Sequence, residues 1–346
     1  MDYSQFYKKA ELALIEAMTS LWVPGHPNEI KHIKDLLERR EPIMAEPEFQ
    51  TIFPWETSSE TFQDHAERLG LFDSDFVKSL SSITDDEYKE YNFPLDRHPY
   101  KHQTNSWRAM LKDRKTIVVT TGTGSGKTEC FMLPVLQDLY DQRKKGVAEG
   151  VQAIFLYPLN ALMKNQQRRI HAWCKSLPSP VTYAIYNGET ERERLPRAIA
   201  GRKFPKICSR EEIRDTPPQI LFTNPTMLNY MLVRDEDQRI INASKGKLRW
   251  ILLDEAHTYT GSSATELALQ IRQVTDAFGV SIDDVNFALT SATIGDSDVA
   301  HALRQLKENA AKLTGKYFED IVVVDGKRII PDFNESKVET ALNTIN

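Results

Sequence analysis

Six short apolar runs between residues 116 and 290 are the feature that most constrains the fold of this chain. Each run is almost continuously apolar and is followed by a polar loop. The runs are TIVVT (116–120), AIFLY (153–157), VTYAIY (181–186), QILFT (219–223), WILLD (250–254) and NFALT (286–290). This pattern is typical of strands that are buried on both faces of a parallel sheet. Helices are predicted between the runs, over 127–140, 160–176, 226–234 and 264–277. We therefore expect an α/β fold with a doubly wound parallel sheet.

The residues before these runs follow a different pattern. Residues 1–95 have apolar positions at helical spacing, interrupted by prolines, so they predict a helical accessory domain without strands. We expect the sheet domain over 96–315, and a small hairpin around Asp325-Gly326 followed by a linker over 316–346. Residues 1–96 contain 9 Lys and Arg against 20 Asp and Glu, a net charge of −11, whereas residues 97–346 contain 35 against 29, a net charge of +6. The acidic segment favours contact with another protein, or with another part of the same chain, over a nucleic-acid backbone, and simple drift in composition explains the asymmetry equally well.

Composition excludes several classes of protein. No apolar run approaches the ~18–20 residues that a membrane span needs, and the first residues lack the pattern of a signal peptide. We therefore expect no membrane partner. The cysteines, Cys130, Cys174 and Cys208, are far apart in the sequence and form no CxxC pair. Their spacing argues against a structural zinc site and a disulfide framework, and it favours the reducing environment of the cytoplasm.

The loop after the first run, TGTGSGKT, predicts a phosphate-binding site. Its glycines allow a tight turn whose N–H groups point at an anion, and the following helix begins there. Lys127 would contact the β- and γ-phosphates of ATP, and Thr128 would bind Mg²⁺. The predicted nucleotide-binding residues of the loop are Thr123, Gly124, Ser125, Gly126, Lys127, Thr128 and Glu129. The strict pattern GxxxxGK[ST] has glycine where this chain has Thr121.

An acidic pair follows the fifth run and predicts ATP hydrolysis. Asp254 would hold Mg²⁺, and Glu255 would orient the attacking water, with Lys127 as the third catalytic residue. An Asp-Glu pair at the end of a strand is often only a helix cap, and that alternative is favoured if the pair is considered alone. The phosphate-binding loop at the same predicted edge of the sheet favours the catalytic interpretation.

Three other strand ends carry small, polar or proline-containing turns. The first turn begins at Pro158, the second directly after Thr223, and the third at Ser291. Such turns present N–H groups and hydroxyls at helix starts, which can bind a phosphodiester backbone without reading its bases. Taken one at a time, these residues are mostly helix caps.

The order of these motifs resembles that of superfamily 2 helicases of the DEAD/DEAH-box type. The matching stretches are TGTGSGKT, YPLNAL, YNGE, TNPTML, DEAH and SAT, and that family permits threonine at the position of Thr121. The resemblance implies a RecA-like fold and a contact of Gln103 with adenine. It implies that His257, Ser291 and Thr293 couple the state of ATP to the nucleic acid. It also implies a strand path. Four basic residues near that path would contribute to it, although a solvated helix face is the favoured interpretation for most of them: Lys164, Arg168, Arg169 and Arg249. That path would be lined by Pro158, Asn160, Gly188, Thr223, Asn224 and Pro225.

Within the superfamily, YPLNALMKNQ, TNPTMLNYMLVR and DEAHTYTG resemble the branch of YprA/MrfA-type DNA-repair helicases and of the large anti-phage helicases of the Druantia and DISARM systems. The resemblance covers residues 97–325, the first of two RecA-like lobes. It implies a DNA helicase or translocase acting on single strands or partial duplexes, with DNA favoured over RNA, in defence or repair. A second lobe would complete the ATP site, so we expect this lobe alone to bind ATP and to hydrolyse it only weakly.

Three alternatives remain open at this stage. An ATP-gated clamp or scaffold that does not unwind would carry the same motifs. A small-molecule kinase would share the phosphate-binding loop, although DEAH and SAT speak against it. Residues 331–337 imitate a PD…ExK nuclease site, but its two halves are only two residues apart, which is too close for the neighbouring strands that such a site needs.

Overall fold

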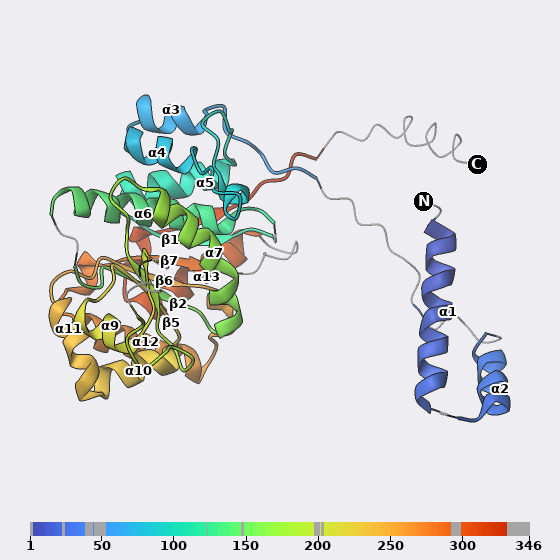
Figure 1. Ribbon diagram of the computed structural model, residues 1–346. Helices are drawn as coiled ribbons and strands as arrows, with labels where there is room; N and C mark the ends of the chain where they lie inside the picture. Colours follow the sequence, from blue (N-terminus) through green and yellow to red (C-terminus); the bar gives the residue numbers. More distant parts are fainter. Residues whose placement is uncertain are drawn as a thin grey trace. The chain divides into compact units, whose positions relative to one another are not determined.

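The computed structural model describes residues 3–22, 25–38, 44, 53–122, 124–146, 149–196, 201, 204–291 and 299–330 (Figure 1). The chain divides into two units, Met1–Phe53 and Pro54–Asn346. The first unit contains helices α1 (Tyr3–Trp22) and α2 (Pro27–Glu38), in agreement with the predicted helical pattern. Among its described side chains, Ile15 and Thr19 are buried.

The second unit is built on an eight-stranded, all-parallel sheet with the strand order β4-β3-β5-β2-β6-β7-β1-β8. Its strands are β1 (Thr116–Thr120), β2 (Ala153–Leu156), β3 (Tyr183–Ile185), β4 (Lys206–Ile207), β5 (Ile220–Thr223), β6 (Trp250–Leu253), β7 (Asn286–Thr290) and β8 (Ile321–Asp325). All six predicted strands are confirmed. The two-residue strand β4 was not predicted, because a pair of residues carries no periodicity.

Helices cover both faces of this sheet (Figure 1). The longer ones are α6 (Lys127–Lys144), α7 (Asn160–Ser176), α10 (Pro225–Val233), α12 (Ser262–Ala277) and α13 (Val299–Thr314), and the four predicted helices agree with the first four of these. The shorter ones are α3 (Phe62–Glu67), α4 (Ser74–Leu80), α5 (Lys101–Trp107), α9 (Arg210–Asp215) and α11 (Gln238–Ala243). Short 3₁₀ turns are η1 (Lys89–Tyr91), η3 (Asp235–Asp237), η4 (Ala256–Thr258), η5 (Ile282–Asp284) and η6 (Phe318–Asp320), and η2 (Arg108–Lys112) is a π-helical turn.

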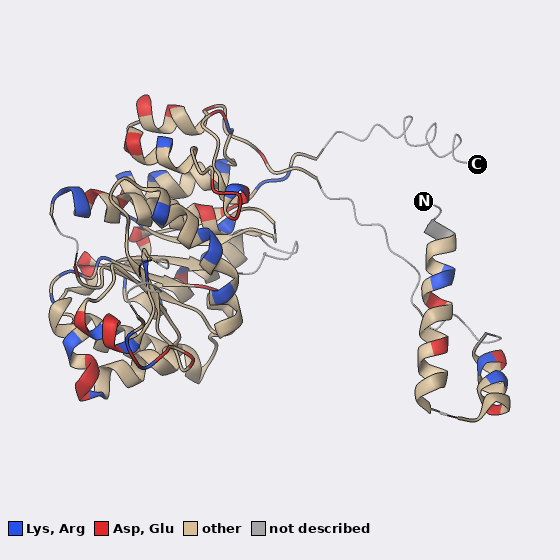
Figure 2. Ribbon diagram, viewed as in Figure 1, with Lys and Arg blue, Asp and Glu red and all other residues tan. Residues whose placement is uncertain are grey.

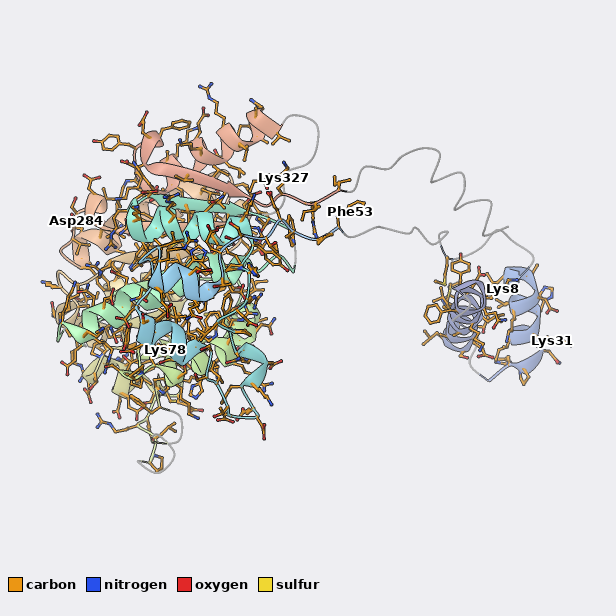
Figure 3. The ribbon with its side chains drawn as sticks, turned by 90° about the horizontal axis from the view of Figure 1, so that it is seen from above. Lys8, Lys31, Phe53, Lys78, Asp284 and Lys327 are labelled. Carbon is orange, nitrogen blue, oxygen red and sulfur yellow. The ribbon has the colours of Figure 1, made fainter. Side chains whose placement is uncertain are left out.

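Successive strand residues enter two separate cores. In β1, Ile117 and Val119 join the core that contains α3 to α7, whereas Val118 joins the core that contains α9 to α13. The same alternation occurs in β2, where Phe155 lies in the first core and Ile154 in the second. Side chains in a strand point alternately to opposite faces, so a strand that is buried on both faces must be apolar throughout. Figure 3 shows the side chains of both layers.

The predicted hairpin around Asp325-Gly326 is wrong. Residues Ile321–Asp325 form β8, which pairs in parallel with β1 along its whole length, from Thr116 opposite Ile321 to Thr120 opposite Asp325. The run IVVV therefore belongs to the sheet. Its partner lies about two hundred residues earlier in the chain, and only the folded structure identifies that pairing.

The predicted boundary of the helical domain at residue 95 also differs from the structure, which divides the chain at Phe53 and Pro54. Residues 54–95 share a core with the sheet unit because their aromatic side chains surround Trp107. The ring of Phe72 lies 5.1 Å from the ring of Trp107, and that of Phe62 lies 5.9 Å from it. Both contacts are between ring centroids, at distances typical of stabilising aromatic pairs.

The observed boundary also changes which unit contains most of the acidic residues, which are coloured red in Figure 2. Residues 54–96 contain 3 Lys and Arg and 11 Asp and Glu, whereas residues 1–53 contain 6 and 9. Most of the acidic excess therefore belongs to the segment that packs on the sheet unit.

Among the helices that the structure describes, none is long and apolar enough to cross a membrane.

Candidate active site

The phosphate-binding loop lies between β1 and α6, with two glycines in the left-handed region. Gly124 and Gly126 both have φ of 72°. A Cβ on Gly126 would lie 2.3 Å from Nε2 of Gln103, so a side chain there would have to displace the amide of Gln103. A Cβ on Gly124 would meet nothing within 4 Å. The loop is therefore packed tightly at its helix end and open at Gly124, where a ligand can approach the backbone. Thr123, predicted to bind the nucleotide, lies outside the described residues.

Two side chains of helix α5 hydrogen-bond to backbone carbonyl groups of the loop. Nε2 of His102 lies 2.7 Å from the carbonyl oxygen of Ser125, and the amide of Gln103 donates to the carbonyl of Gly126 at 3.2 Å. Gln103 is completely buried, and its side-chain oxygen accepts from the N–H of Tyr100 at 3.0 Å. The contact of Gln103 with adenine stays a prediction. His102 was missed by sequence reasoning, because nothing in a lone histidine on a helix indicates its partner.

Thr121 joins the two ends of the loop. It is buried, and its hydroxyl lies 2.5 Å from the hydroxyl of Ser125. Glycine at this position could not make that contact. The departure from the strict loop pattern thus supplies a hydrogen bond that holds the loop closed between β1 and α6.

The DEAH segment follows β6 and is tied to the end of β7. The hydroxyl of Thr290 donates to Oδ1 of Asp254 at 2.6 Å and accepts from the backbone N–H of Glu255 at 2.9 Å. Glu255 has φ of 50°, an unusual conformation for a residue other than glycine, of the kind often found at functional sites. Its carboxylate lies 3.3 Å from Nδ1 of His257. Thr290 thus positions both acidic residues, although the sequence pattern marked it only as the end of a strand.

Lys127 connects the loop to the segment after β7. Its ammonium group donates to the carbonyl oxygen of Ser291 at 3.5 Å, a long hydrogen bond. The carboxyl ends of β1, β6 and β7 thus bring Lys127, Asp254 and Ser291 together, as predicted for neighbouring parallel strands. Thr293, predicted to act with Ser291, lies outside the described residues.

The residues present fit a nucleotide phosphate with a magnesium ion. The described residues contain no group of three or more His, Cys, Asp and Glu side chains that could hold a metal by themselves. Mg²⁺ commonly takes only one or two carboxylates and completes its shell with phosphate oxygens and water. Burial raises the pKa of Asp254, to which the nearby charge of Glu255 adds, while the hydrogen bond from Thr290 opposes the rise. A cation beside Asp254 would offset the cost of its buried charge.

Replacing Asp254 with Asn should therefore stabilise the protein when no metal is present. The substitution removes a negative charge that burial disfavours, and the amide oxygen can still accept from Thr290. We expect a gain of about 0.5–2 kcal/mol in the free energy of unfolding at pH 7. Urea denaturation in EDTA measures it. A loss of stability in EDTA would show that the charge of Asp254 is compensated within the chain.

The predicted strand path lies at the carboxyl ends of β3, β5 and β2, which are neighbours in the sheet. The amide of Asn224 donates to Oδ1 of Asn160 at 3.0 Å, and its oxygen caps α10 by accepting from the N–H of Met227. Thr223 donates to the carbonyl of Tyr186, and the carbonyl of Pro225 accepts from Gln270. Asn160 and Asn224 thus form one pair. No hydrogen bond joins this pair to Gly188 among the described contacts.

Other side chains around the path have structural partners. The guanidinium of Arg210, which sequence reasoning missed, donates to the carbonyl oxygen of Gly188 at 3.3 Å. The four basic residues considered for the path are also engaged with protein groups. Lys164 pairs with Glu189, Arg168 with the carbonyl of Glu87, Arg169 with Glu129, and Arg249 with Asp138. Arg249 therefore has a structural role at the start of β6. Pro158 lies two residues after Leu156, the last residue of β2.

Comparisons with known proteins agree with this geometry. The family model described as DEAD/DEAH box helicase matches residues 100–302. Druantia protein DruE of Escherichia coli (strain UMEA 4076-1) is 26% identical over 352 residues, which cover 75% of this chain and 19% of that protein. The ATP-dependent helicase YprA of Bacillus subtilis (strain 168) is 28% identical over 247 residues, covering 70% of this chain and 28% of that protein. The chain thus spans less than a third of either relative.

Solved structures give the same assignment. The structure of the helicase MrfA bound to DNA and AMPPNP has a TM-score of 0.53 at 25% identity and covers 79% of this chain and 31% of MrfA. Mss116p bound to ssRNA and AMP-PNP has a TM-score of 0.56 at 16% identity, covers 79% of this chain and 47% of Mss116p, and shows the RecA-like fold alone. The predicted fold and the resemblance to the YprA/MrfA-type branch are confirmed. Since the family model covers more than half of its residues, the chain belongs to the DEAD/DEAH box helicase family.

Proposed function

We propose that this chain is the ATP-binding lobe of an ATP-dependent DNA helicase or translocase from an anti-phage defence or DNA-repair system. One observation carries the proposal. The phosphate-binding loop, the DEAH segment and Ser291 meet at one edge of the sheet, where Lys127 donates to the carbonyl of Ser291 at 3.5 Å. The group that would hold the γ-phosphate is thus hydrogen-bonded to Ser291, one of the predicted coupling residues.

Each residue of the site has a role that its position supports. Lys127 and the backbone N–H groups near Gly124 would hold the phosphates, with the start of α6 favouring negative charge. Thr128 and Asp254 would hold Mg²⁺, which neutralises charge that develops on the phosphates. Glu255 would orient the attacking water and accept its proton. The hydroxyl of Thr290 fixes the positions of both acidic residues, because it donates to the carboxylate of Asp254 and accepts from the backbone N–H of Glu255.

A DNA strand is the proposed partner of the neighbouring edge. Asn160, Asn224 and Gly188 follow strands that are adjacent in the sheet, and they would contact the backbone of a single strand or partial duplex without reading its sequence. The structure of MrfA bound to DNA and AMPPNP supports DNA over RNA. The similarity to Druantia protein DruE supports a role in defence. The similarity to the ATP-dependent helicase YprA supports the YprA/MrfA-type branch, whose resemblance implies repair as the other role.

Three further features belong to the proposal. A second RecA-like lobe would complete the ATP site, in agreement with the greater length of both relatives. The acidic surface of residues 54–96 and the two-helix unit before it would contact protein partners. Among the described residues Cys130, Cys174 and Cys208 form no disulfide, and the first two are buried, which supports a cytoplasmic location.

The test is ATP hydrolysis by this lobe together with its second lobe. Single-stranded DNA should raise the rate well above that seen without nucleic acid, because strand binding and ATP binding meet at neighbouring strand ends of one sheet. A rate that neither single-stranded DNA nor RNA changes would contradict the proposal. A strand-displacement assay on the same protein then separates a helicase from a clamp that hydrolyses ATP without unwinding.

A further inference from the structure

Residues 54–58 form an extended segment, here called the strap, that lies between two other parts of the sheet unit. On one side the N–H of Glu56 donates to the carbonyl of Lys327 at 2.9 Å, and the N–H of Ile329 donates to the carbonyl of Pro54 at 2.9 Å. Trp55 and Arg328 form an antiparallel bridge there. Lys327 is labelled in Figure 3. The strap is thus fastened to the residues that leave β8.

On its other side the strap is fastened to the start of α5. The N–H of Lys101 donates to the carbonyl of Glu56 at 2.8 Å, and the N–H of Ser58 donates to the carbonyl of Pro99 at 2.7 Å. An ion pair of 2.6 Å between Lys101 and Glu56 adds to this side. Since α5 holds the phosphate-binding loop, the strap connects the end of β8 to the nucleotide site.

Trp55 is the side chain through which this connection reaches the loop. It is 7% exposed, its ring stands edge-on to His102 at 5.5 Å between centroids, and the guanidinium of Arg328 lies 3.5 Å above it. These contacts enclose the ring on more than one side. His102 in turn contacts the carbonyl of Ser125 in the loop.

Gly326 packs closely against both Trp55 and Thr121. A Cβ at this position would lie 2.7 Å from Cγ2 of Thr121 and 2.7 Å from Cζ3 of Trp55. The requirement for glycine is therefore one of space, since Gly326 does not have a positive φ. Thr121, Trp55 and Gly326 form one packed group, and no atom can be added to it without moving the loop or the strap.

We propose that Trp55 and Gly326 are positioning residues of the nucleotide site. Together they hold Thr121 and His102 in the places from which both contact Ser125, and they thereby set the shape of the phosphate-binding loop. Neither residue is among those proposed to bind the nucleotide. This inference rests on the proposed function, because the loop's shape matters only if the loop binds ATP.

The test is the Gly326→Ala variant. The added methyl group pushes on Thr121 and so displaces the loop. We expect the Kd for a fluorescent ATP analogue and the KM for ATP to rise about tenfold, since small displacements of a binding group have large effects. We expect kcat to fall as well, since Lys127 belongs to the loop, but by a smaller factor than KM rises, because Asp254 and Glu255 are held by Thr290 on other strands. The matched control is Gly201→Ala, where a Cβ meets nothing within 4 Å and φ is not positive. It should bind the analogue as the wild type does.

A second substitution separates positioning from a general loss of structure. Thr121→Ser removes Cγ2 and keeps the hydroxyl that contacts Ser125, so Thr121→Ser/Gly326→Ala should bind the analogue more tightly than Gly326→Ala. If Gly326→Ala does not fold, Trp55→Phe gives the same readout by shortening the ring, with a rise in KM larger than any change in kcat. A wild-type Kd in Gly326→Ala or in Trp55→Phe, or a weakened Kd that Thr121→Ser leaves unchanged, overturns the inference. Failure of the proposed function looks different, because the wild type and Lys127→Ala would then bind the analogue equally.

Discussion

Replacing Lys127 with Ala should lower ATP hydrolysis on the order of 10²–10³-fold, the usual cost of removing one donor that stabilises charge in a transition state. Lys127 starts α6 next to Gly126, and its ammonium group lies between the loop and Ser291. Among the described residues of the loop, Lys127 is the only one with a positively charged side chain at the carboxyl edge of the sheet. The measurement is steady-state ATP hydrolysis with saturating single-stranded DNA, in the protein that includes the second lobe.

The Lys127→Ala variant should fold as the wild type does. The hydrogen bond to Ser291 is 3.5 Å long, at the limit of useful geometry, so its loss has little effect on stability. Lys175→Ala is a suitable control, since this lysine makes an exposed ion pair with Asp85 on another face and its removal should leave hydrolysis unchanged. Hydrolysis that persists in Lys127→Ala, with the melting temperature unchanged, would mean that the nucleotide site is misassigned.

Replacing Asp138 with Ala should destabilise the protein by about 1.5–3 kcal/mol, the range for hydrogen bonds to charged groups, because the carboxylate is buried whereas its partner Arg249 is partly exposed. Asp138 lies in α6 and is 4% exposed. Its carboxylate accepts from Nε and Nη2 of Arg249 at 2.7 and 2.9 Å and from the indole N–H of Trp250 at 2.7 Å. The substitution leaves a guanidinium and an indole without their acceptor where α6 meets the start of β6. Chemical denaturation at pH 7 measures the effect.

The same carboxylate predicts a dependence on pH. Burial alone would raise the pKa of Asp138, but the hydrogen bonds and charge of Arg249, with a contribution from Trp250, lower it below the ordinary value. A lowered pKa means that the folded state binds the proton less tightly than the unfolded state. The stabilisation is therefore present above the unfolded pKa and is lost as the pH falls through the folded pKa. The difference in the free energy of unfolding between the wild type and Asp138→Ala should therefore become smaller at acidic pH.

A matched control separates this pair from a general effect of removing an acid. Asp113 is exposed at the end of η2, so Asp113→Ala should change the free energy of unfolding by less than about 0.5 kcal/mol. An equal loss in the two variants, or a loss in Asp138→Ala that does not narrow in acid, would contradict the role of the buried pair.

Much of the fold could be predicted because its elements have local signals. The strands of the central sheet are apolar on both faces, so runs such as TIVVT and WILLD were recognisable without their partners. The phosphate-binding loop has a spacing that a phosphate requires. The sequence predicts a hairpin at β8, which in fact pairs with β1, because a short valine run is compatible with any partner strand. Residues 54–95 look like an independent helical domain until the aromatic cluster around Trp107 shows where they pack.

The sequence by itself determined the class of this protein, because a glycine-rich loop, an acidic pair and small polar turns at successive strand ends meet at one edge of any parallel sheet. Only the tertiary structure decided how that edge is held. It placed Thr290 between Asp254 and Glu255, set His102 and Thr121 against Ser125, and joined Trp55 to Gly326 across more than two hundred residues. The physical reason is that hydrogen bonds and close packing depend on distances between side chains from remote segments, and no local pattern contains those distances.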